Sequence, residues 1–107
     1  MNSYRVQFFV GLEFDRNNGR MHGTIDTGRE ALLQTYDGVT TNTGHGAWLN
    51  PDTGKVVAEL QVTFTVLCYG TEADVWSGAK DRAERLRDLY NQSAVLVTVE
   101  PVRFVFV

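Results

Sequence analysis

The sequence predicts an α+β domain in which two helices pack on one face of a four-stranded antiparallel sheet. Three observations lead to this prediction. Residues 4–14 and 55–69 alternate apolar and polar side chains, which is the period of a half-buried strand. Residues 75–90 repeat apolar side chains at helical spacing. A second, shorter helix and two further strand-like runs complete the order β-α-β-β-α-β.

The first strand is expected over residues 4–14, and a Gly-rich loop follows it. The first helix is expected to begin at Thr27, because Glu30 three residues later completes a capping box. Gly38 is a suitable C-terminal stop. The expected apolar face of this helix consists of Leu32, Leu33 and Tyr36.

Residues 39–49 form a polar, strand-like run, and residues 55–69 form the most regular alternation in the chain. Residues 50–54 between them read Asn-Pro-Asp-Thr-Gly. Proline presets φ, Asp52 can bond to its own backbone, and Gly54 tolerates a positive φ. The two runs are therefore predicted to form a hairpin.

The second helix is expected to start at Thr71, with Asp74 in its first turn, and to end at Asn91. Residues 94–107 are expected to close the chain as a long strand. Pro101 cannot donate to a sheet ladder, so this strand is expected at an edge or with a bulge, and Pro101 is the point at which its apolar face can switch.

A β-α-β-β-α-β order with both helices on one face is the ferredoxin-like arrangement, with strand order 4-1-3-2. Pro101 agrees with that order, because the fourth strand then lies at an edge. Residues 1–107 are expected to form a single domain of this kind.

The face of the sheet opposite the helices carries many apolar side chains for a solvated surface. It is expected to include Phe9, Val57, Leu67 and Tyr69, together with Val95, Val97 and Val99 or with Val105 and Val107. We therefore expect a partner or a ligand on this face. The preferred partner is a second copy of the chain, which gives a homo-oligomer through the open sheet face or the edge strands.

Composition excludes several classes of function. The net charge is −3, and the basic residues at 80–87 are interleaved with acidic ones, which argues against nucleic-acid binding. Cys68 is the only cysteine, so there is no internal disulfide, and its position on the inward stripe predicts a buried, inert thiol. With no signal peptide and no membrane-length apolar run recognisable, the expected location is cytoplasmic and no membrane contact is expected.

The two histidines, His22 and His45, both lie in Gly-rich surroundings. His22-Gly23-Thr24 fits the His-x-Ser/Thr motif of two-histidine phosphoesterases, but His45-Gly46-Ala47 lacks the hydroxyl. No spacing selects a third metal ligand from an acidic residue. The sequence therefore predicts two unrelated histidines, no metal site and no cofactor.

The candidate ligand-binding residues are His45, Trp48, Glu59 and Gln61. Trp48 follows Gly46 on a strand with few apolar residues, so its ring could stack on a planar ligand, fill a subunit seam or simply pack on Val57 across the hairpin. Glu59 and Gln61 lie on the polar face of the strand predicted over residues 55–69.

The second half of the chain resembles a family of small, uncharacterised bacterial proteins known as a domain of unknown function. The shared features are Gly46-Ala47-Trp48, a turn at 50–54, and Gly54 followed five residues later by Glu59. Tyr90, the run 92–96 and the run 102–106 match the family's later motifs, and the Phe9-Val10-Gly11 step matches its first strand. The resemblance implies an α+β fold and a role for Gly46, Trp48 and Glu59, and it implies no established activity.

The sequence favours a non-enzymatic, oligomeric module that binds a small polar or aromatic ligand or a protein partner. No nucleophile, acid–base pair or metal cluster stands out to indicate an enzyme. One alternative is a small hydrolase or isomerase that uses His45 and Glu59 as acid and base, completed across a dimer interface. The other alternative is a structural assembly unit of phage or mobile-element origin.

Overall fold

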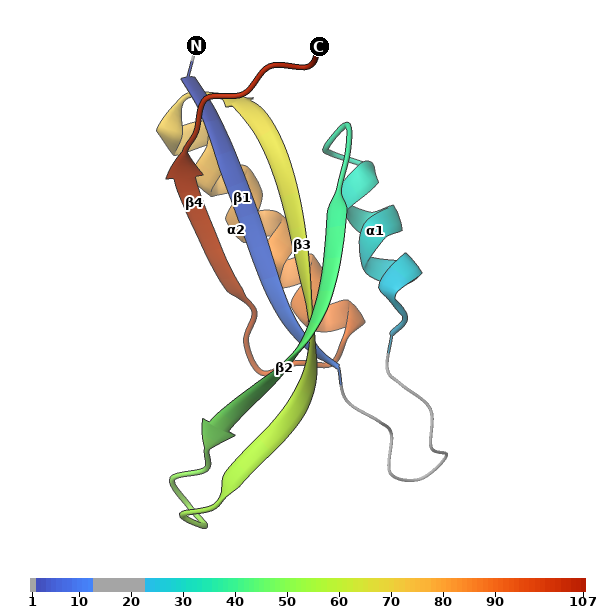
Figure 1. The fold of residues 1–107 in the computed structure, drawn as a ribbon, viewed down its shortest axis with the longest axis vertical. Coiled ribbons are helices and arrows are strands. Elements are labelled where there is room, and N and C mark those ends of the chain that lie inside the picture. The colour runs from blue at the N-terminus through green and yellow to red at the C-terminus, as the bar shows by residue number, and fades with distance from the viewer. Residues whose placement is uncertain (1, 13–22) are drawn as a thin grey trace.

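The computed structural model describes residues 2–12 and 23–107. The chain runs through six elements in the order expected from the sequence (Figure 1). They are β1 (Asn2–Leu12), α1 (Ile25–Leu33), β2 (Thr40–Leu49), β3 (Val56–Gly70), α2 (Glu72–Leu89) and β4 (Leu96–Pro101). The end of the predicted first strand at Phe14, the following loop and His22 lie outside the described residues.

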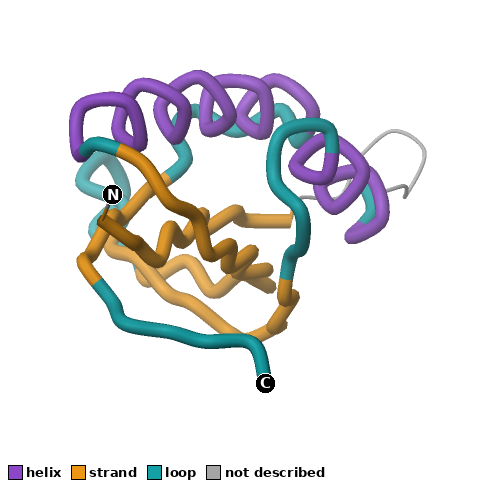
Figure 2. The backbone as a smooth tube through the Cα atoms, turned by 90° about the horizontal axis from the view of Figure 1, so that it is seen from above, coloured by secondary structure: helices purple, strands orange, loops and turns teal. Residues whose placement is uncertain are grey.

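The four strands form one antiparallel sheet in the order β2-β3-β1-β4, which is 4-1-3-2 read from the other edge. Both helices lie on the same side of this sheet (Figure 2). The ferredoxin-like α+β fold predicted from the sequence is therefore confirmed. Among the described helices, none combines the length and apolar character that crossing a membrane would require.

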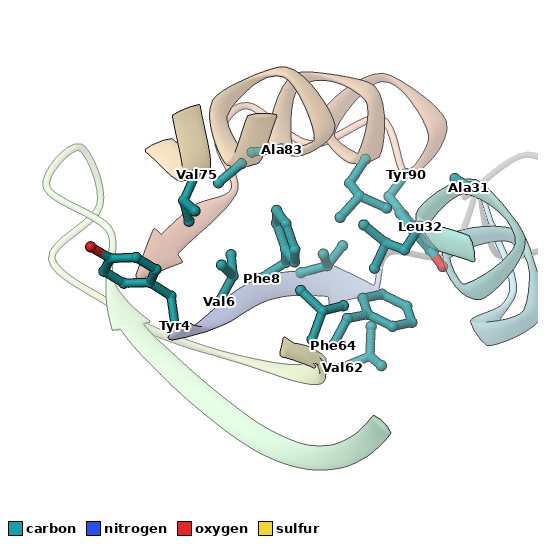
Figure 3. Packing of buried hydrophobic residues seen from close by; sticks show 14 of the residues in the cluster. Tyr4, Val6, Phe8, Ala31, Leu32, Val62, Phe64, Val75, Ala83 and Tyr90 are labelled. Carbon is teal, nitrogen blue, oxygen red and sulfur yellow. The ribbon is translucent and has the colours of Figure 1, made fainter. Parts of the chain in front are cut away.

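The core lies between the sheet and the two helices, and it uses the side chains that the alternation assigned to one face (Figure 3). β1 contributes every second residue from Tyr4 to Leu12, and β3 contributes Val62, Phe64 and Val66. The phenyl groups of Phe8 and Phe64 are fully buried. Burying side chains of this size stabilises the fold by about 1.5–3 kcal/mol each.

α1 begins one turn earlier than the sequence analysis placed it. Its N-cap is Thr24, whose hydroxyl accepts from the Thr27 N–H, while the Thr27 side chain accepts from the Thr24 N–H. The predicted start at Thr27 is therefore wrong. The capping box is formed by Thr24 and Thr27, and not by Thr27 and Glu30, because the Thr27 hydroxyl at the third helical position makes the bond to the N-cap backbone that a Glu side chain usually makes. The helix also ends at Leu33, before Gly38, and Leu33 is half exposed rather than part of the core face.

α2 follows its prediction closely. Thr71 is the N-cap, and its hydroxyl accepts from the Asp74 N–H at 3.2 Å. The helix ends at Leu89, and Tyr90 is buried just after it. The Tyr90 hydroxyl donates to the Thr24 carbonyl (2.5 Å) and accepts from the Gly28 N–H (2.9 Å), so it fastens the end of α2 to the start of α1.

β2 and the first half of β3 continue past the body of the domain as a hairpin, which we call the arm (residues 44–61; Figure 1). Its tip is the predicted turn, in which the Gly54 N–H donates to the Asn50 carbonyl and Gly54 has φ +69°. The side chain that bonds to the turn backbone is Asn50, which accepts from the Asp52 N–H, and not Asp52 itself. Most arm residues are exposed, so the arm is held by its ladder rather than by a core.

The last strand is shorter than the sequence predicted. β4 stops at Pro101, and residues 102–107 leave the sheet as a tail that crosses on the side away from the helices (Figure 2). β4 is an edge strand, as the proline indicated, and the Val102 N–H just after Pro101 still donates to the Ser3 carbonyl of β1. The register pairs Val97 with Phe8 and Val99 with Val6, so both valines face the helices and Leu96 faces the open side.

Candidate functional site

Three of the four predicted site residues share the open face of the arm, on the side of the sheet away from the helices. The register pairs Gly46 with Glu59, Trp48 with Val57 and Gly44 with Gln61. Directly paired residues on adjacent strands point to the same face. Trp48, Glu59 and Gln61 therefore project from one surface, and Glu59 and Gln61 lie where the arm joins the sheet.

A polar cluster forms at this junction around Gly11 of β1. The Gln61 Nε2 donates to Glu59 Oε1 at 3.4 Å. A Cβ placed on Gly11 would lie 3.0 Å from Glu59 Oε2 and 2.8 Å from Gln92 Oε1, so these two oxygens converge above the glycine. The Gln92 Nε2 donates to the Tyr90 carbonyl, which directs the amide oxygen toward the cluster. The junction thus gathers one carboxylate and two amides.

Glycine leaves room for the side chains of this cluster at two points. A Cβ on Gly46 would lie 2.5 Å from Gln61 Cδ, and one on Gly11 would displace Glu59 and Gln92. Gly44, on the same face of β2, has nothing within 4 Å of its Cβ position. Gly46 therefore gives the Gln61 side chain the space it occupies, whereas Gly44 serves no such purpose.

Trp48 lies farther out on the arm and is 46% exposed. Its cross-strand partner is Val57, so the pairing that the sequence suggested is present. That pairing covers only part of the indole. A half-exposed tryptophan on the same face as a carboxylate can stack on a planar group that the polar cluster holds.

His45 does not join this group within one chain. It pairs with Leu60, on the face of the arm directed toward the helices, and it is exposed. Consecutive strand residues point to opposite faces, so His45 and its neighbour Gly46 diverge. The predicted constellation of His45 with Trp48 and Glu59 is therefore divided between two faces, and a pairing of His45 with His22 lies outside the described residues.

The groups with raised pKa values lie away from the cluster. Burial raises the pKa of the Tyr36 hydroxyl to about 12 and also raises the pKa values of the Cys68 thiol and the Tyr90 hydroxyl. Cys68 lies on the helix side of β3, as the sequence predicted, but it is only half-buried. Within residues 2–12 and 23–107, no group of three His, Cys, Asp or Glu side chains could hold a metal ion.

Gln92 is the site residue that sequence reasoning missed. It follows Asn91, which has φ +52°, in the connection between α2 and β4. An asparagine in the left-handed region reverses the chain at a helix end, and the reversal turns Gln92 toward the sheet. The Tyr-Asn-Gln run after a helical pattern was the available signal, but only the fold brings it beside Glu59.

No protein-family model and no curated protein sequence matches the chain. Solved structures do match in fold. A phage SAM lyase in complex with S-methyl-5′-thioadenosine superposes with a TM-score of 0.74 at 16% identity, over 94% of this chain and 81% of that one. GlnK of B. subtilis in complex with ATP gives 0.60 at 10% identity, over 95% of this chain and 84% of that one.

A Bacillus cereus protein related to NIF3 gives a TM-score of 0.63 at 15% identity, over 94% of this chain and 26% of that one. The three proteins are named for different roles, and identities of this order establish a shared fold alone. The likeness extends over nearly the whole chain, so the complete sheet and both helices take part in it.

Proposed function

We propose that this protein is an oligomeric binding module whose ligand lies on the open face, where the arm joins the sheet. The single observation that carries the proposal is the convergence of Glu59 Oε2 and Gln92 Oε1 above Gly11, beside Gln61 and on the same face as the exposed Trp48. Convergent polar groups next to an aromatic surface are typical of small-molecule sites.

The chemistry of the cluster selects the ligand class. Glu59 and Gln92 direct acceptor oxygens to one spot, so the complementary group is a donor such as a hydroxyl or an amine. None of the ion pairs among the described residues involves Glu59, so no basic partner offsets its carboxylate there. The negative charge of a phosphate would be repelled by that carboxylate. A nucleoside offers hydroxyls to the carboxylate and a flat base to Trp48.

The fold neighbours support a nucleoside ligand. The phage SAM lyase is bound to S-methyl-5′-thioadenosine and GlnK to ATP, so adenosine derivatives are ligands of two proteins with this fold. Of the two, the thioadenosine lacks phosphate and suits the acidic cluster. We therefore propose an uncharged or cationic adenosine derivative as the ligand.

The exposed apolar side chains support assembly. Trp48, Leu67, Tyr69 and Leu96 lie on the open face, Val105, Phe106 and Val107 lie in the tail, and Leu49 and Val56 lie on the opposite face of the arm. Fully burying one aromatic residue removes about 150–250 Å² from water, and a stable interface needs about 800 Å² per partner. The aromatic and aliphatic groups together supply area on that scale, and a neighbouring copy would close the open side of the site.

Calorimetric titration with S-methyl-5′-thioadenosine tests the proposal, with ATP as the comparison ligand. Trp48→Ala should weaken binding about tenfold or more, because a stacked base contributes about 1–3 kcal/mol. Trp76→Ala, on the outer side of α2, is the matched control and should bind as the wild type does. The proposed site would be contradicted if the wild-type protein did not bind the thioadenosine, or if both variants lost affinity for it equally.

An enzymatic role is the second candidate, favoured by the neighbour whose name is that of a lyase. Because His45 and Glu59 lie on opposite faces of the arm, they could act on one substrate only if two copies contributed one residue each. Chromatography of SAM incubated with the wild type and with Glu59→Gln tests this role. Turnover that Glu59→Gln abolishes would replace the binding role with catalysis.

The third candidate, a structural unit of phage origin, is favoured by the phage source of the same neighbour and by the exposed apolar surface. It predicts an assembled protein without affinity for any nucleoside. A stable oligomer that gives no heat with the thioadenosine or with ATP would select this role over the other two.

A further inference from the structure

Two strand edges of the sheet are left without a partner among the described residues. β2 pairs with β3 only as far as Thr40 and Thr65, so residues 66–70 of β3 have β1 on one side and no strand on the other. β4 pairs with β1 on its inner side and is the outermost strand on its outer side (Figure 1). Unpaired edges expose backbone N–H and C=O groups that readily pair with another chain.

The free edge of β3 lies in an apolar hollow of about 630 Å³. It is lined by Leu67 and Tyr69 of β3, by Tyr36 and Val39 of the α1–β2 connection, and by Phe104 and Phe106 of the tail. The Phe104 ring packs on Tyr69 at 5.0 Å between centroids, while Phe106 remains 82% exposed. The hollow thus combines an open backbone ladder with apolar walls.

We propose that this hollow receives the outer edge of β4 from a second copy of the chain. Five residues of β3 are free and β4 is six residues long, so the two edges match in length. They lie at opposite edges of the same sheet. Each copy can therefore pair its β4 with the free β3 edge of one neighbour and pair its own β3 edge with the β4 of another. Such head-to-tail contacts close into a ring when the rotation between copies allows it. The inference rests on the oligomer of the proposed function and specifies its contacts.

The composition of the β3 edge fits a copy of this chain better than a polar peptide. Residues 66–70 read Val-Leu-Cys-Tyr-Gly and contain no lysine or proline, the residues that usually protect a solvent-exposed edge, whereas β4 carries a proline only at its last residue, Pro101. Leu96 on β4 is 63% exposed and would enter the hollow as an apolar group. The one charge on β4, Glu100, is already paired with Arg5, so docking would bury no unpaired charge.

Cysteine cross-linking tests the proposed contact. The double variant Leu67→Cys with Thr98→Cys, in a Cys68→Ser background, places one thiol on the open face of each edge. Within one chain β1 separates the two strands and the two positions are offset by two residues along them, so the thiols are about 12 Å apart and beyond the reach of a disulfide. A short bis-maleimide can join the two thiols of neighbouring copies even if the register between β3 and β4 places them too far apart for a disulfide. Oxidation or the reagent should give a covalent ladder that ends at the ring number.

The controls separate this contact from random collisions. Each single-cysteine variant can form at most a covalent dimer, and Leu67→Cys with Ser77→Cys places the second thiol on the outer face of α2. Neither should give a ladder. Native mass spectrometry of the unmodified chain needs no variant and should show a single closed oligomer of at least three copies.

A monomer or a two-fold dimer at tens of micromolar would overturn the edge pairing, as would an oligomer whose double variant gives no ladder. Ligand binding is measured independently. A monomer that binds the thioadenosine would contradict the edge pairing and support the binding site. A ring that cross-links into a ladder but does not bind the thioadenosine would support the edge pairing and contradict the proposed ligand.

Discussion

Replacing Gly28 with alanine tests how closely α1 packs on the sheet. In an exposed helix interior, Gly→Ala stabilises by about 1 kcal/mol. At Gly28 the added Cβ would lie 2.5 Å from the Tyr90 hydroxyl oxygen and against the Phe64 ring. Phe64 and Tyr90 are at most 1% exposed, so neither ring can yield toward solvent without opening the core.

The magnitude follows from these contacts. Overpacking a filled core costs about 1–3 kcal/mol. Moving Tyr90 also weakens its hydrogen bonds to the Gly28 N–H and the Thr24 carbonyl, each contributing about 0.5–1.5 kcal/mol. These losses exceed the gain in helix propensity. We therefore expect Gly28→Ala to lower the free energy of unfolding by about 1–3 kcal/mol.

Gly78 in α2 is the matched control, because a Cβ there would meet nothing within 4 Å. Gly78→Ala should raise the free energy of unfolding by about 0.5–1 kcal/mol. Urea titrations followed by circular dichroism measure both variants, with unchanged m-values as the condition for comparison. If Gly28→Ala were as stable as the wild type, the close packing of α1 on Phe64 would be refuted.

Three further predictions concern the site, the alkaline limit of the fold and a helix cap. Gly46→Ala displaces Gln61, so it should weaken thioadenosine binding at least tenfold in calorimetry with little change in stability. Gly44→Ala is the control and should bind as the wild type does. Equal affinities of the two variants would contradict a role for the polar cluster in binding. The partly buried, neutral hydroxyl of Tyr36 has a raised pKa, so its contribution to stability is complete below pH 10 and is lost as the pH rises through about 12. Tyr36→Phe should therefore reduce the loss of stability at high pH in alkaline unfolding curves, and an unchanged loss would exclude Tyr36 as its cause. Thr71→Ala should cost about 1 kcal/mol in urea titrations, and a smaller loss than a few tenths would mean that water replaces the cap.

Much of the fold could be predicted because alternation and helical spacing reflect burial directly. Every second residue from Tyr4 to Leu12 faces the core, and Val75, Ala79, Ala83 and Leu86 form the buried stripe of α2, as their spacing indicates. The strand order then followed from the short hairpin and from the proline in the last strand.

The errors arose where two local solutions were nearly equal. Thr24 and Thr27 can both cap a helix, and the contact that accompanies the start at Thr24 comes from Tyr90, whose hydroxyl donates to the Thr24 carbonyl from 66 residues away along the chain. The run after Pro101 keeps its β-forming composition, but β4 ends at Pro101 and, after one further bond from the Val102 N–H to the Ser3 carbonyl, the rest becomes a tail.

The candidate site was predictable only in part. Trp48, Glu59 and Gln61 share a face because strand residues two apart do so, and the register of the hairpin brings Trp48 onto the same side. The same alternation separates His45 from Glu59, which the sequence analysis had placed together. Gln92 and Gly11 join the cluster through strand pairing and a helix end, neither of which has a local signature.

Native mass spectrometry of the wild-type chain, with S-methyl-5′-thioadenosine and ATP both present, tests the central claim most directly, because it reports assembly and ligand in one spectrum. The account predicts an oligomer that carries the mass of the thioadenosine on its subunits and does not carry ATP. A bare monomer at micromolar concentration would contradict both the assembly and the site. An oligomer loaded with ATP would contradict the role assigned to the Glu59 carboxylate.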